Sequence, residues 1–250
     1  MTHIALVSLS TTLRGAAART FGKSVRVVQV RQISPHVLRA CFEGAALRGI
    51  SVRPGMKIKL HVGGGEMRSY TPAAVDSVAG TMDVVVHCHG DSAASRWAAA
   101  LQPGDAATFM GPGSSVAAPP DVLPWAGFFG DETTIGLAEA ILSAIPESTP
   151  IIGAVETLAE DMAAVSGLRI EAVERASRHG DALVAHLADL ELPSGAGVIW
   201  LSGEASGVLA LRAALLDRGM GREQLCIKPY WSLRGKAHRK ELERRVLRND

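Results

Sequence analysis

Hydrophobic residues in the first half of the chain mostly recur at every second position, which is the period of a strand with one buried face. The stretches with this pattern are 25–30, 37–42, 58–62 and 84–86. Segments rich in Gly and Pro separate them, and a single helix is predicted over residues 93–101. Short strands at this spacing are typical of an antiparallel barrel or sandwich.

The pattern changes near residue 120, where short apolar runs begin to alternate with segments of helical periodicity. The predicted strands are 125–129, 151–155, 168–173, 198–201 and 225–227. The predicted helices are 135–145, a short segment after 155, 179–190, 204–218 and 236–248. Repeated strand–helix units indicate a mostly parallel, doubly wound sheet.

The predicted organisation is therefore an N-terminal antiparallel β-barrel followed by a C-terminal α/β domain. We expect residues 1–20 to form a tail, residues 21–118 to form the barrel domain and residues 121–250 to form the α/β domain, which ends in a basic helix. The linker is expected at 116–120, because Pro119 and Pro120 restrict the backbone and remove two hydrogen-bond donors. Fold alone does not assign chemistry.

Composition excludes several classes of protein. The 250 residues are 47% hydrophobic and 20% charged, with a net charge of +1, which fits a globular protein and argues against a nucleic-acid binder. No apolar run approaches the roughly 20 residues of a membrane-spanning helix, and the first residues do not read as a signal peptide. The scattered Cys41, Cys88 and Cys226 form no disulfide or metal-binding motif. We expect a cytoplasmic monomer without membrane insertion.

The first motif with candidate chemistry is Arg68-Ser69-Tyr70-Thr71, followed by Pro72. In a strand, Arg68 and Tyr70 face one side while Ser69 and Thr71 face the other. Arginine offers a planar fork to a phosphate, tyrosine a flat ring, and the hydroxyls hydrogen bonds to a heterocycle. The alternative is an edge strand that a proline ends.

The second motif leads from His87-Cys88-His89-Gly90 into a predicted helix that starts among small residues. A helix start with little side-chain bulk can receive a pyrophosphate, whereas Ser92 or Ser95 as a simple N-cap is the alternative. His87 and His89 share a strand face, but no third ligand is near, so we predict no metal site.

The third motif is Gly130-Asp131-Glu132-Thr133, at a strand-to-helix turn, and Ser202-Gly203-Glu204 is a second such turn. The carboxyl ends of strands are where α/β sheets bind ligands. Acidic residues suit a helix N-terminus but repel a phosphate placed there. We therefore expect the nicotinamide end or the ribose of a nucleotide here, and the chain lacks the usual Rossmann and P-loop fingerprints.

Two basic segments complete the candidates. Lys57, Lys59 and His61 alternate with apolar residues, so one face of this strand is cationic. The last predicted helix carries Arg239 and a stripe of cations at every fourth residue: Lys236, Lys240, Arg244 and Arg248. Charge runs are usually solvated surfaces, and the functional alternative is a rim that attracts an anionic substrate.

Taken together, these motifs resemble the siderophore-interacting protein family, the FAD-linked ferric-siderophore reductases of the ferredoxin–NADP reductase-like superfamily. The resemblance covers roughly residues 21–235 and rests on the order of its motifs. They are Arg53-Pro54-Gly55, Arg68-Ser69-Tyr70-Thr71, His89-Gly90, Ala94-Ser95-Arg96-Trp97-Ala98, Gln102-Pro103-Gly104-Asp105, Gly111-Pro112-Gly113, Gly130-Asp131-Glu132-Thr133, Ser202-Gly203-Glu204 and Tyr230-Trp231.

The resemblance implies FAD in the barrel domain and NADPH or NADH in the α/β domain. The implied cofactor-binding residues are Arg68, Ser69, Tyr70, Thr71, His87, His89, Gly90, Ala94, Ser95, Trp97, Gly130, Asp131, Glu132, Thr133, Gly203, Glu204, Tyr230 and Trp231. Arg68 is expected near the FAD phosphates, Tyr70 against the ring system, and Tyr230 and Trp231 near the other side of the flavin. Lys57, Lys59 and Arg239 are the candidate contacts to a ferric siderophore.

The expected activity is reduction of a ferric siderophore, with NAD(P)H as the electron donor and FAD as the relay. The cofactor carries the difficult chemistry, so no catalytic side chain and no protein metal ligand are expected. Two alternatives stay open: a flavin oxidoreductase that passes electrons to a carrier protein, and a flavin- or siderophore-binding module without catalysis.

Overall fold

The computed structural model describes residues 22–247, so the predicted tail 1–20 and Arg248 lie outside the described residues. The chain divides into two compact units, with the boundary between Ser115 and Val116. Each unit is described by itself. Among the described residues, no helix has the length and apolar character needed to cross a membrane.

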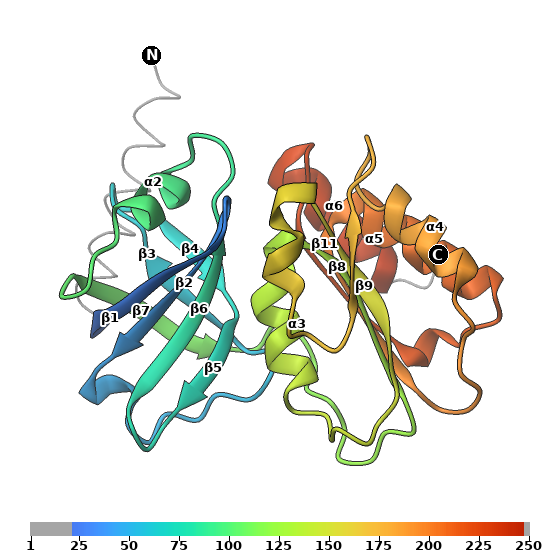
Figure 1. Ribbon diagram of the computed structural model, residues 1–250, viewed down its shortest axis with the longest axis horizontal. Coiled ribbons are helices and arrows are strands. Elements are labelled where there is room, and N and C mark those ends of the chain that lie inside the picture. The colour runs from blue at the N-terminus through green and yellow to red at the C-terminus, as the bar shows by residue number, and fades with distance from the viewer. Residues whose placement is uncertain (1–21, 248–250) are drawn as a thin grey trace. The chain divides into compact units, whose positions relative to one another are not determined.

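Unit 1 is an antiparallel sheet of seven strands (Figure 1, blue to green). The strands are β1 (Lys23–Ser34), β2 (Val37–Glu43), β3 (Lys57–His61), β4 (Met67–Tyr70), β5 (Pro72–Asp76), β6 (Thr81–His87) and β7 (Ala106–Gly113). Their order across the sheet is β4-β3-β7-β1-β2-β6-β5. The alternating apolar residues of the sequence supply its buried face, as the prediction required.

The sheet of unit 1 curls into a barrel because of one connection. β4 and β5 lie at opposite edges of the sheet, yet Thr71 alone separates them in the chain. Consecutive Cα atoms are about 3.8 Å apart, so the two edges must approach each other. Pro72 suits the first position of β5, because a proline at the start of an edge strand removes no central ladder hydrogen bond.

Side chains from all around this barrel fill its interior. Phe42, Leu60 and Phe109 are fully buried there. Helix α2 (Ala93–Ala100) follows β6 and packs Ala98 against the same core. The barrel and its helix are thus one hydrophobic unit, which fixes the positions of β4 and of the segment that leads into α2.

Unit 2 is a parallel five-stranded sheet (Figure 1, yellow-green to red). Its strands are β8 (Ala126–Asp131), β9 (Ile151–Thr157), β10 (Glu171–Glu174), β11 (Val198–Glu204) and β12 (Leu225–Trp231), in the order β10-β9-β8-β11-β12. The helices are α3 (Ile135–Leu142), α4 (Asp181–Asp189), α5 (Ala205–Asp217) and α6 (Gly235–Leu247). Short 3₁₀ segments are η1 (Ala45–Leu47) in unit 1, and η2 (Glu132–Thr134), η3 (Ala159–Val165) and η4 (Arg222–Gln224) in unit 2.

Helices cover both faces of the parallel sheet. Figure 1 shows α3 on one face and α4 and α5 on the other. Every residue of β8 is buried, because a central parallel strand has no solvated face. Leu183 of α4 and Leu211 of α5 join Phe129 and Leu201 in one core. This is the doubly wound arrangement that the sequence predicts.

The structure corrects several predicted elements. β5 and β7 were not predicted, since Pro72 and the Gly-rich end of β7 conceal their periodicity. The helical segment after residue 155 is the 3₁₀ helix η3, and the strand expected at 168–173 is the shorter β10. Segment 116–120 belongs to unit 2, where the Ala117 carbonyl accepts a hydrogen bond of 3.0 Å from the Trp200 indole.

A side chain at Gly180 should reduce the stability of the protein, because this residue lies at the contact between α4 and α5. Its φ is +90°, and a Cβ there would lie 2.4 Å from the Cα of Gly207. Gly180→Ala should lower the free energy of unfolding by about 1–2 kcal/mol from backbone strain, plus about 1–3 kcal/mol from overpacking. The measurement is urea unfolding followed by tryptophan fluorescence.

Gly195→Ala is the matched control for this prediction. Gly195 has the same φ of +90°, but a Cβ there would meet nothing within 4 Å. Only the backbone strain should remain in this variant. Equal losses of stability in the two variants would contradict a close helix contact at Gly180.

Candidate functional site

The strand order of unit 2 reverses between β8 and β11, which are neighbours in the sheet but far apart in the sequence. Because all five strands are parallel, their carboxyl ends meet at one edge. Ligands of open α/β sheets bind outside this edge, at the point where the strand order reverses. Asp131 ends β8 and Glu204 ends β11, so the third sequence motif and its companion turn lie together at this point.

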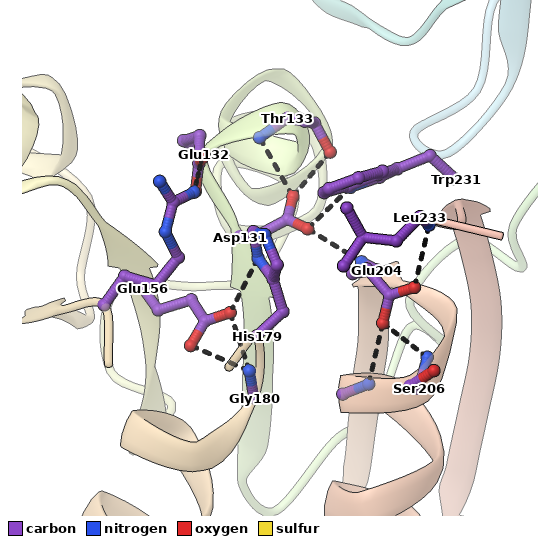
Figure 2. A network of polar contacts seen from close by, with 12 residues as sticks. Asp131, Glu132, Thr133, Glu156, His179, Gly180, Glu204, Ser206, Trp231 and Leu233 are labelled. Carbon is purple, nitrogen blue, oxygen red and sulfur yellow. Dashed lines mark hydrogen bonds and ion pairs between the residues drawn. The ribbon is translucent and has the colours of Figure 1, made fainter. Parts of the chain in front are cut away.

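Asp131 joins three strand ends through its carboxylate, which is 2% exposed (Figure 2). One oxygen, Oδ2, accepts hydrogen bonds from the Glu204 main-chain N–H at 2.7 Å and from the Trp231 indole at 2.8 Å. The other, Oδ1, accepts from the N–H of Thr133 at 3.0 Å and from its hydroxyl at 2.5 Å. Asp131 therefore connects the strand ends at this edge, and both of its carboxylate oxygens are bonded to protein groups.

Gly203 makes the approach of Asp131 to β11 possible. It has a φ of +123°, and a Cβ at this position would lie 2.6 Å from Asp131 Oδ2. Glu204 follows and caps α5: Oε2 accepts from the N–H of Ser206 at 2.6 Å and of Gly207 at 3.2 Å. Its Oε1 accepts from the N–H of Leu233 at 3.2 Å. Figure 2 shows this carboxylate at the start of the helix.

The end of β12 carries a bulge that places an aromatic ring at the same edge. Gly203 pairs with Pro229, while Glu204 pairs with Trp231, so Tyr230 is the extra residue. Bulges re-aim side chains and are frequent beside active sites. The Trp231 ring is held by Asp131 on one side and meets the ring of His179 edge to face, with centroids 4.9 Å apart.

A third acidic residue, Glu156, is the last but one residue of β9, the strand between β10 and β8. Both of its oxygens accept from the N–H of Gly180, at 2.8 and 3.0 Å, and its Oε1 lies 3.4 Å from His179 Nδ1. Asp131, Glu156 and Glu204 line a cavity of about 10 Å³ between the sheet and helices α4 and α5. That volume matches a single water molecule, so any larger ligand binds outside it.

Burial changes the acidity of this cluster. Removal from water raises the pKa of Asp131, and the hydrogen bonds from Thr133, Trp231 and Glu204 oppose that rise. Burial also raises the pKa of Glu132, and the negative charge of Asp131 adds to the effect. Glu132 forms an ion pair with Arg175, which follows β10. The predicted residues Asp131, Glu132 and Glu204 are thus buried structural acids of the site.

The first sequence motif lies on the edge strand β4 of unit 1. Arg68 and Tyr70 pair with Leu60 and Ile58 of β3, and Tyr70 packs against the barrel core. Burial raises the pKa of Tyr70 to about 12, with a contribution from the Cys88 thiol and an opposing one from Arg68. Tyr70 is therefore a neutral, ordered ring beside the end of β6.

The faces of this motif differ in part from the prediction. Ser69 is exposed, whereas Thr71 is buried. Thr71 lies between β4 and β5, so the alternation of the strand does not extend to it. Arg68 forms an ion pair with Glu66, and both side chains are 40% exposed, so the guanidinium remains reachable from solvent.

The second motif forms the turn from β6 to α2. Gly90 has a φ of +55°, and a Cβ there would meet nothing within 4 Å. Ser92 is the N-cap of α2 and accepts a hydrogen bond of 3.1 Å from the N–H of Ser95. The Ser95 hydroxyl donates to the His89 carbonyl at 2.9 Å. Because Tyr70 and Cys88 both pack against the barrel core, this turn and the Arg68–Thr71 motif are anchored to the same core of unit 1.

The remaining predicted residues of unit 1 border the same turn. His87 ends β6, and its ring stacks on that of His89 with centroids 5.5 Å apart. Ala94 and Trp97 of α2 pack against the barrel core. In residues 22–247, no three His, Cys, Asp or Glu side chains are grouped so as to hold a metal ion.

The basic candidates separate into two places. Lys57 and Lys59 alternate with the buried Ile58 on β3, as predicted, and Lys59 pairs with Ser69 of β4. Arg239 lies on α6, where it is ion-paired with Glu243 at 2.6 Å. The cationic strand face therefore adjoins the Arg68–Thr71 motif, while Arg239 is engaged by Glu243 of its own helix and by the Pro229 carbonyl of β12.

Glu156, Arg175, His179 and Gly180 were not predicted from the sequence. One signal for Glu156 was present, since three apolar strands of unit 2 carry an acidic residue at the last position or the one before it: Asp131, Glu156 and Glu204. His179 and Arg175 lie in loops without a motif, and only the tertiary fold brings them to the edge.

Two family models match the chain. The siderophore-interacting FAD-binding domain matches residues 63–116, and the siderophore-interacting protein model matches residues 123–234. The chain belongs to the siderophore-interacting protein family, a family of FAD-binding oxidoreductases. No curated protein matches the sequence at a significant level.

Solved structures share the fold. A siderophore utilization protein from T. fusca has 24% sequence identity and a TM-score of 0.72, over 85% of this chain and 93% of that chain. The siderophore-interacting protein SipS from Aeromonas hydrophila has 22% identity and a TM-score of 0.74, over 92% and 98%. The ferredoxin reductase in carbazole 1,9a-dioxygenase has 17% identity and a TM-score of 0.69, over 84% and 69%. These likenesses define a ferredoxin reductase-like fold.

The residues of unit 1 fit FAD. In the described residues β4 has one strand neighbour, β3, so its other side is available for main-chain hydrogen bonds to a ligand. Arg68 offers a cation, and α2 begins with Ala93, Ala94 and Ser95, which leave room beside the helix start. A diphosphate suits such a start, and the open backbone at Gly90 permits close approach.

The ion pair between Glu156 and His179 predicts a pH-dependent contribution to stability. The Glu156 carboxylate, an acceptor beside His179 Nδ1, raises the pKa of His179 above its ordinary 6.5, against the opposing effect of burial. The folded state therefore binds the proton more tightly than the unfolded chain. Stability from this pair is fully present below pH 6.5 and is lost as the pH rises through the raised pKa.

Glu156→Gln should lower the titration midpoint of the His179 imidazole, measured by NMR, and remove this part of the pH dependence of urea unfolding. Glu147→Gln is the control, because Glu147 is exposed and lies just before β9, at the opposite edge of the sheet. An unchanged His179 midpoint in Glu156→Gln would show that the pair does not set the histidine's charge.

Proposed function

We propose that the protein is an NAD(P)H-dependent reductase that uses FAD to reduce ferric siderophores and so releases Fe(II) for iron acquisition. The observation that carries the proposal is the match of the FAD-binding domain to residues 63–116, where edge strand β4 and the start of α2 form a fitting site. The parallel sheet of unit 2, with its strand order reversing at β8 and β11, supports a site for the nucleotide donor.

Unit 1 is proposed as the FAD-binding domain. Arg68 would contact the phosphates, Ser69 and Thr71 would hydrogen-bond the flavin edge, and Tyr70 would pack against its ring. The turn from His87 to Trp97 would hold the ribityl diphosphate. When bound, FAD accepts a hydride from a reduced nicotinamide and can release electrons one at a time. The half-buried, neutral Tyr70 supplies a flat surface for such a ring.

Unit 2 is proposed as the donor-binding domain. The edge formed by Gly130–Thr133 and Gly203–Glu204 would face the nicotinamide nucleotide, and Tyr230 and Trp231 would lie beside the reacting rings. Asp131 is assigned a positioning role, because its oxygens are directed at Thr133, Glu204 and Trp231. No side chain is assigned as a general acid or nucleophile.

The proposed substrate is an anionic ferric chelate. Hard oxygen ligands hold Fe(III) more tightly than Fe(II), so reduction loosens the metal. Lys57 and Lys59 form a cationic strand face next to Ser69, which supports an approach of the chelate beside the proposed flavin site. Arg239, the third candidate, is ion-paired with Glu243, which also pairs with Lys228, and it is less available to a chelate.

One observation favours a second candidate function, electron transfer to an acidic carrier protein. The exposed side chains Arg234, Lys236, Lys240 and Arg244 place four cations on α6 and the residues before it. Opposite charge steers the encounter of two proteins and makes it sensitive to salt. Salt-dependent turnover with an acidic ferredoxin or flavodoxin, and none with ferric chelates, would support this candidate instead.

The proposed function is tested by absorbance spectroscopy of the purified protein under anaerobic conditions. The protein should be yellow, NADH or NADPH should bleach the flavin band, and a ferric chelate should restore it while an Fe(II) indicator reports release. A protein that stays colourless after incubation with FAD would overturn the proposal. A flavin that no nicotinamide bleaches would indicate a binding module.

Arg68→Ala should weaken FAD binding. A charge-assisted hydrogen bond contributes about 1.5–3 kcal/mol, which corresponds to an affinity about 10- to 150-fold lower. The measurement is the FAD dissociation constant from fluorescence titration of the apoprotein. Arg31→Ala is the control, because Arg31 is exposed on β1 and should leave FAD affinity unchanged. Equal FAD affinity in both variants would argue against the phosphates lying at Arg68.

Lys59→Ala should slow reduction of an anionic chelate such as ferric citrate while leaving bleaching of the flavin by NADH unchanged. The loss in kcat/KM should be about two- to fivefold at low salt and should shrink at high salt, since an exposed charge is screened. Arg31→Ala serves again as the control for net charge. A loss that is independent of salt would contradict an electrostatic role.

A further inference from the structure

Three helical segments begin around the switch point of unit 2, and at each start a buried carboxylate accepts hydrogen bonds from one or two main-chain N–H groups. Asp131 holds Thr133 in η2, which leads into α3, and Glu204 holds Ser206 and Gly207 in α5. Glu156 holds Gly180, the residue that precedes α4. Figure 2 shows the three carboxylates between these segments.

This arrangement conflicts with the usual way in which such sheets hold a dinucleotide. A nucleotide diphosphate is normally placed on a helix start at the carboxyl edge, because free N–H groups and the helix dipole attract it. Here a carboxylate already binds one or two N–H groups at each start, and its negative charge repels a second anion. Asp131, Glu156 and Glu204 are at most 4% exposed, so solvent screens the repulsion poorly.

The cavity at this edge is too small to hold a phosphate away from the carboxylates. The cavity that the three carboxylates line is about 10 Å³, which suits one water molecule and excludes a phosphate. Gly180 and Gly207 close it on the helix side, since a Cβ on Gly180 would already lie 2.4 Å from Gly207 Cα. A phosphate could reach the N–H groups only by displacing a buried carboxylate.

The same edge favours the other end of the donor. Trp231 offers a flat ring that Asp131 and His179 hold in place. A dihydronicotinamide is neutral, and after it gives up a hydride, one proton with two electrons, its ring is a pyridinium cation. A negative environment disfavours a diphosphate and stabilises this developing positive charge.

Resting on the proposed function, we infer that unit 2 recognises its donor through the nicotinamide and ribose and gains little from the adenosine diphosphate half. Short reduced nicotinamides then serve as hydride donors to the FAD-loaded protein about as well as NADH. NADPH serves equally, because a 2′-phosphate lies on the half that is not recognised. Glu156 and Glu204, with Asp131, are the residues that determine this specificity.

The inference is tested by anaerobic stopped-flow bleaching of the FAD-loaded protein with NADH, NADPH and dihydronicotinamide riboside. The three second-order rate constants should agree within about fivefold, since no charge-assisted diphosphate contact of about 1.5–3 kcal/mol is lost in the riboside. A riboside more than about 50-fold slower than NADH, a ratio worth about 2.3 kcal/mol, would overturn the inference. If no donor bleaches the flavin, the proposed function itself fails.

Binding provides a readout that does not depend on turnover. By calorimetry, NAD⁺ and nicotinamide mononucleotide should bind the FAD-loaded protein with dissociation constants within about fivefold of each other. ADP-ribose should neither bind detectably nor compete with them. Tight binding of ADP-ribose, or competition by it against NADH, would overturn the inference even if all donors react.

Glu204→Gln tests the residue assignment. The variant removes the charge at the start of α5 and should tighten ADP-ribose and NADH binding several-fold. Glu147→Gln, an exposed change at the opposite edge, should alter none of these values. Unchanged ADP-ribose binding in a folded Glu204→Gln protein would remove Glu204 from the assignment, and the comparison of donors on the native protein remains decisive if this variant does not fold.

Discussion

The carboxylate of Asp131 is the interaction on which the edge of unit 2 depends. It is withdrawn from water and accepts hydrogen bonds from the ends of β11 and β12 and from the turn after β8. An ionised carboxylate is costly to bury unless donors satisfy it, and here two donors meet each oxygen. Removing one donor would leave part of the Asp131 charge without a hydrogen bond. Thr133 and Trp231, together with Gly203, which permits the close approach, therefore depend on one another.

That arrangement has a chemical consequence. Buried carboxylates stabilise the turns and helix starts of unit 2. The same carboxylates make the electrostatic potential negative at the edge where a nucleotide donor would approach. A doubly wound sheet ordinarily offers helix starts to phosphate, but here the negative carboxylates of Glu156 and Glu204 already bind N–H groups at two of these starts. Stability of the fold and selectivity for the donor therefore come from the same side chains.

In unit 1 the decisive constraint is the closure of the barrel. One residue, Thr71, connects strands at opposite edges of its sheet, so the barrel closes beside Arg68 and Tyr70. Closure leaves the outer side of β4 without a strand partner in the described chain, and Tyr70 and Cys88, which precedes the turn at Gly90, pack against the same core. The position proposed for FAD is thus a product of how the barrel closes.

The sequence by itself determined the barrel and α/β classes and most of the strands, because burial on one face or on two imposes distinct periods on apolar residues. It also determined the acidic strand ends at Asp131 and Glu204, since motif and turn are local. Tertiary structure alone decided that Glu156 and His179 join them and that Thr71 is buried. Those contacts depend on strand order and barrel closure, and neither has a signature in neighbouring residues.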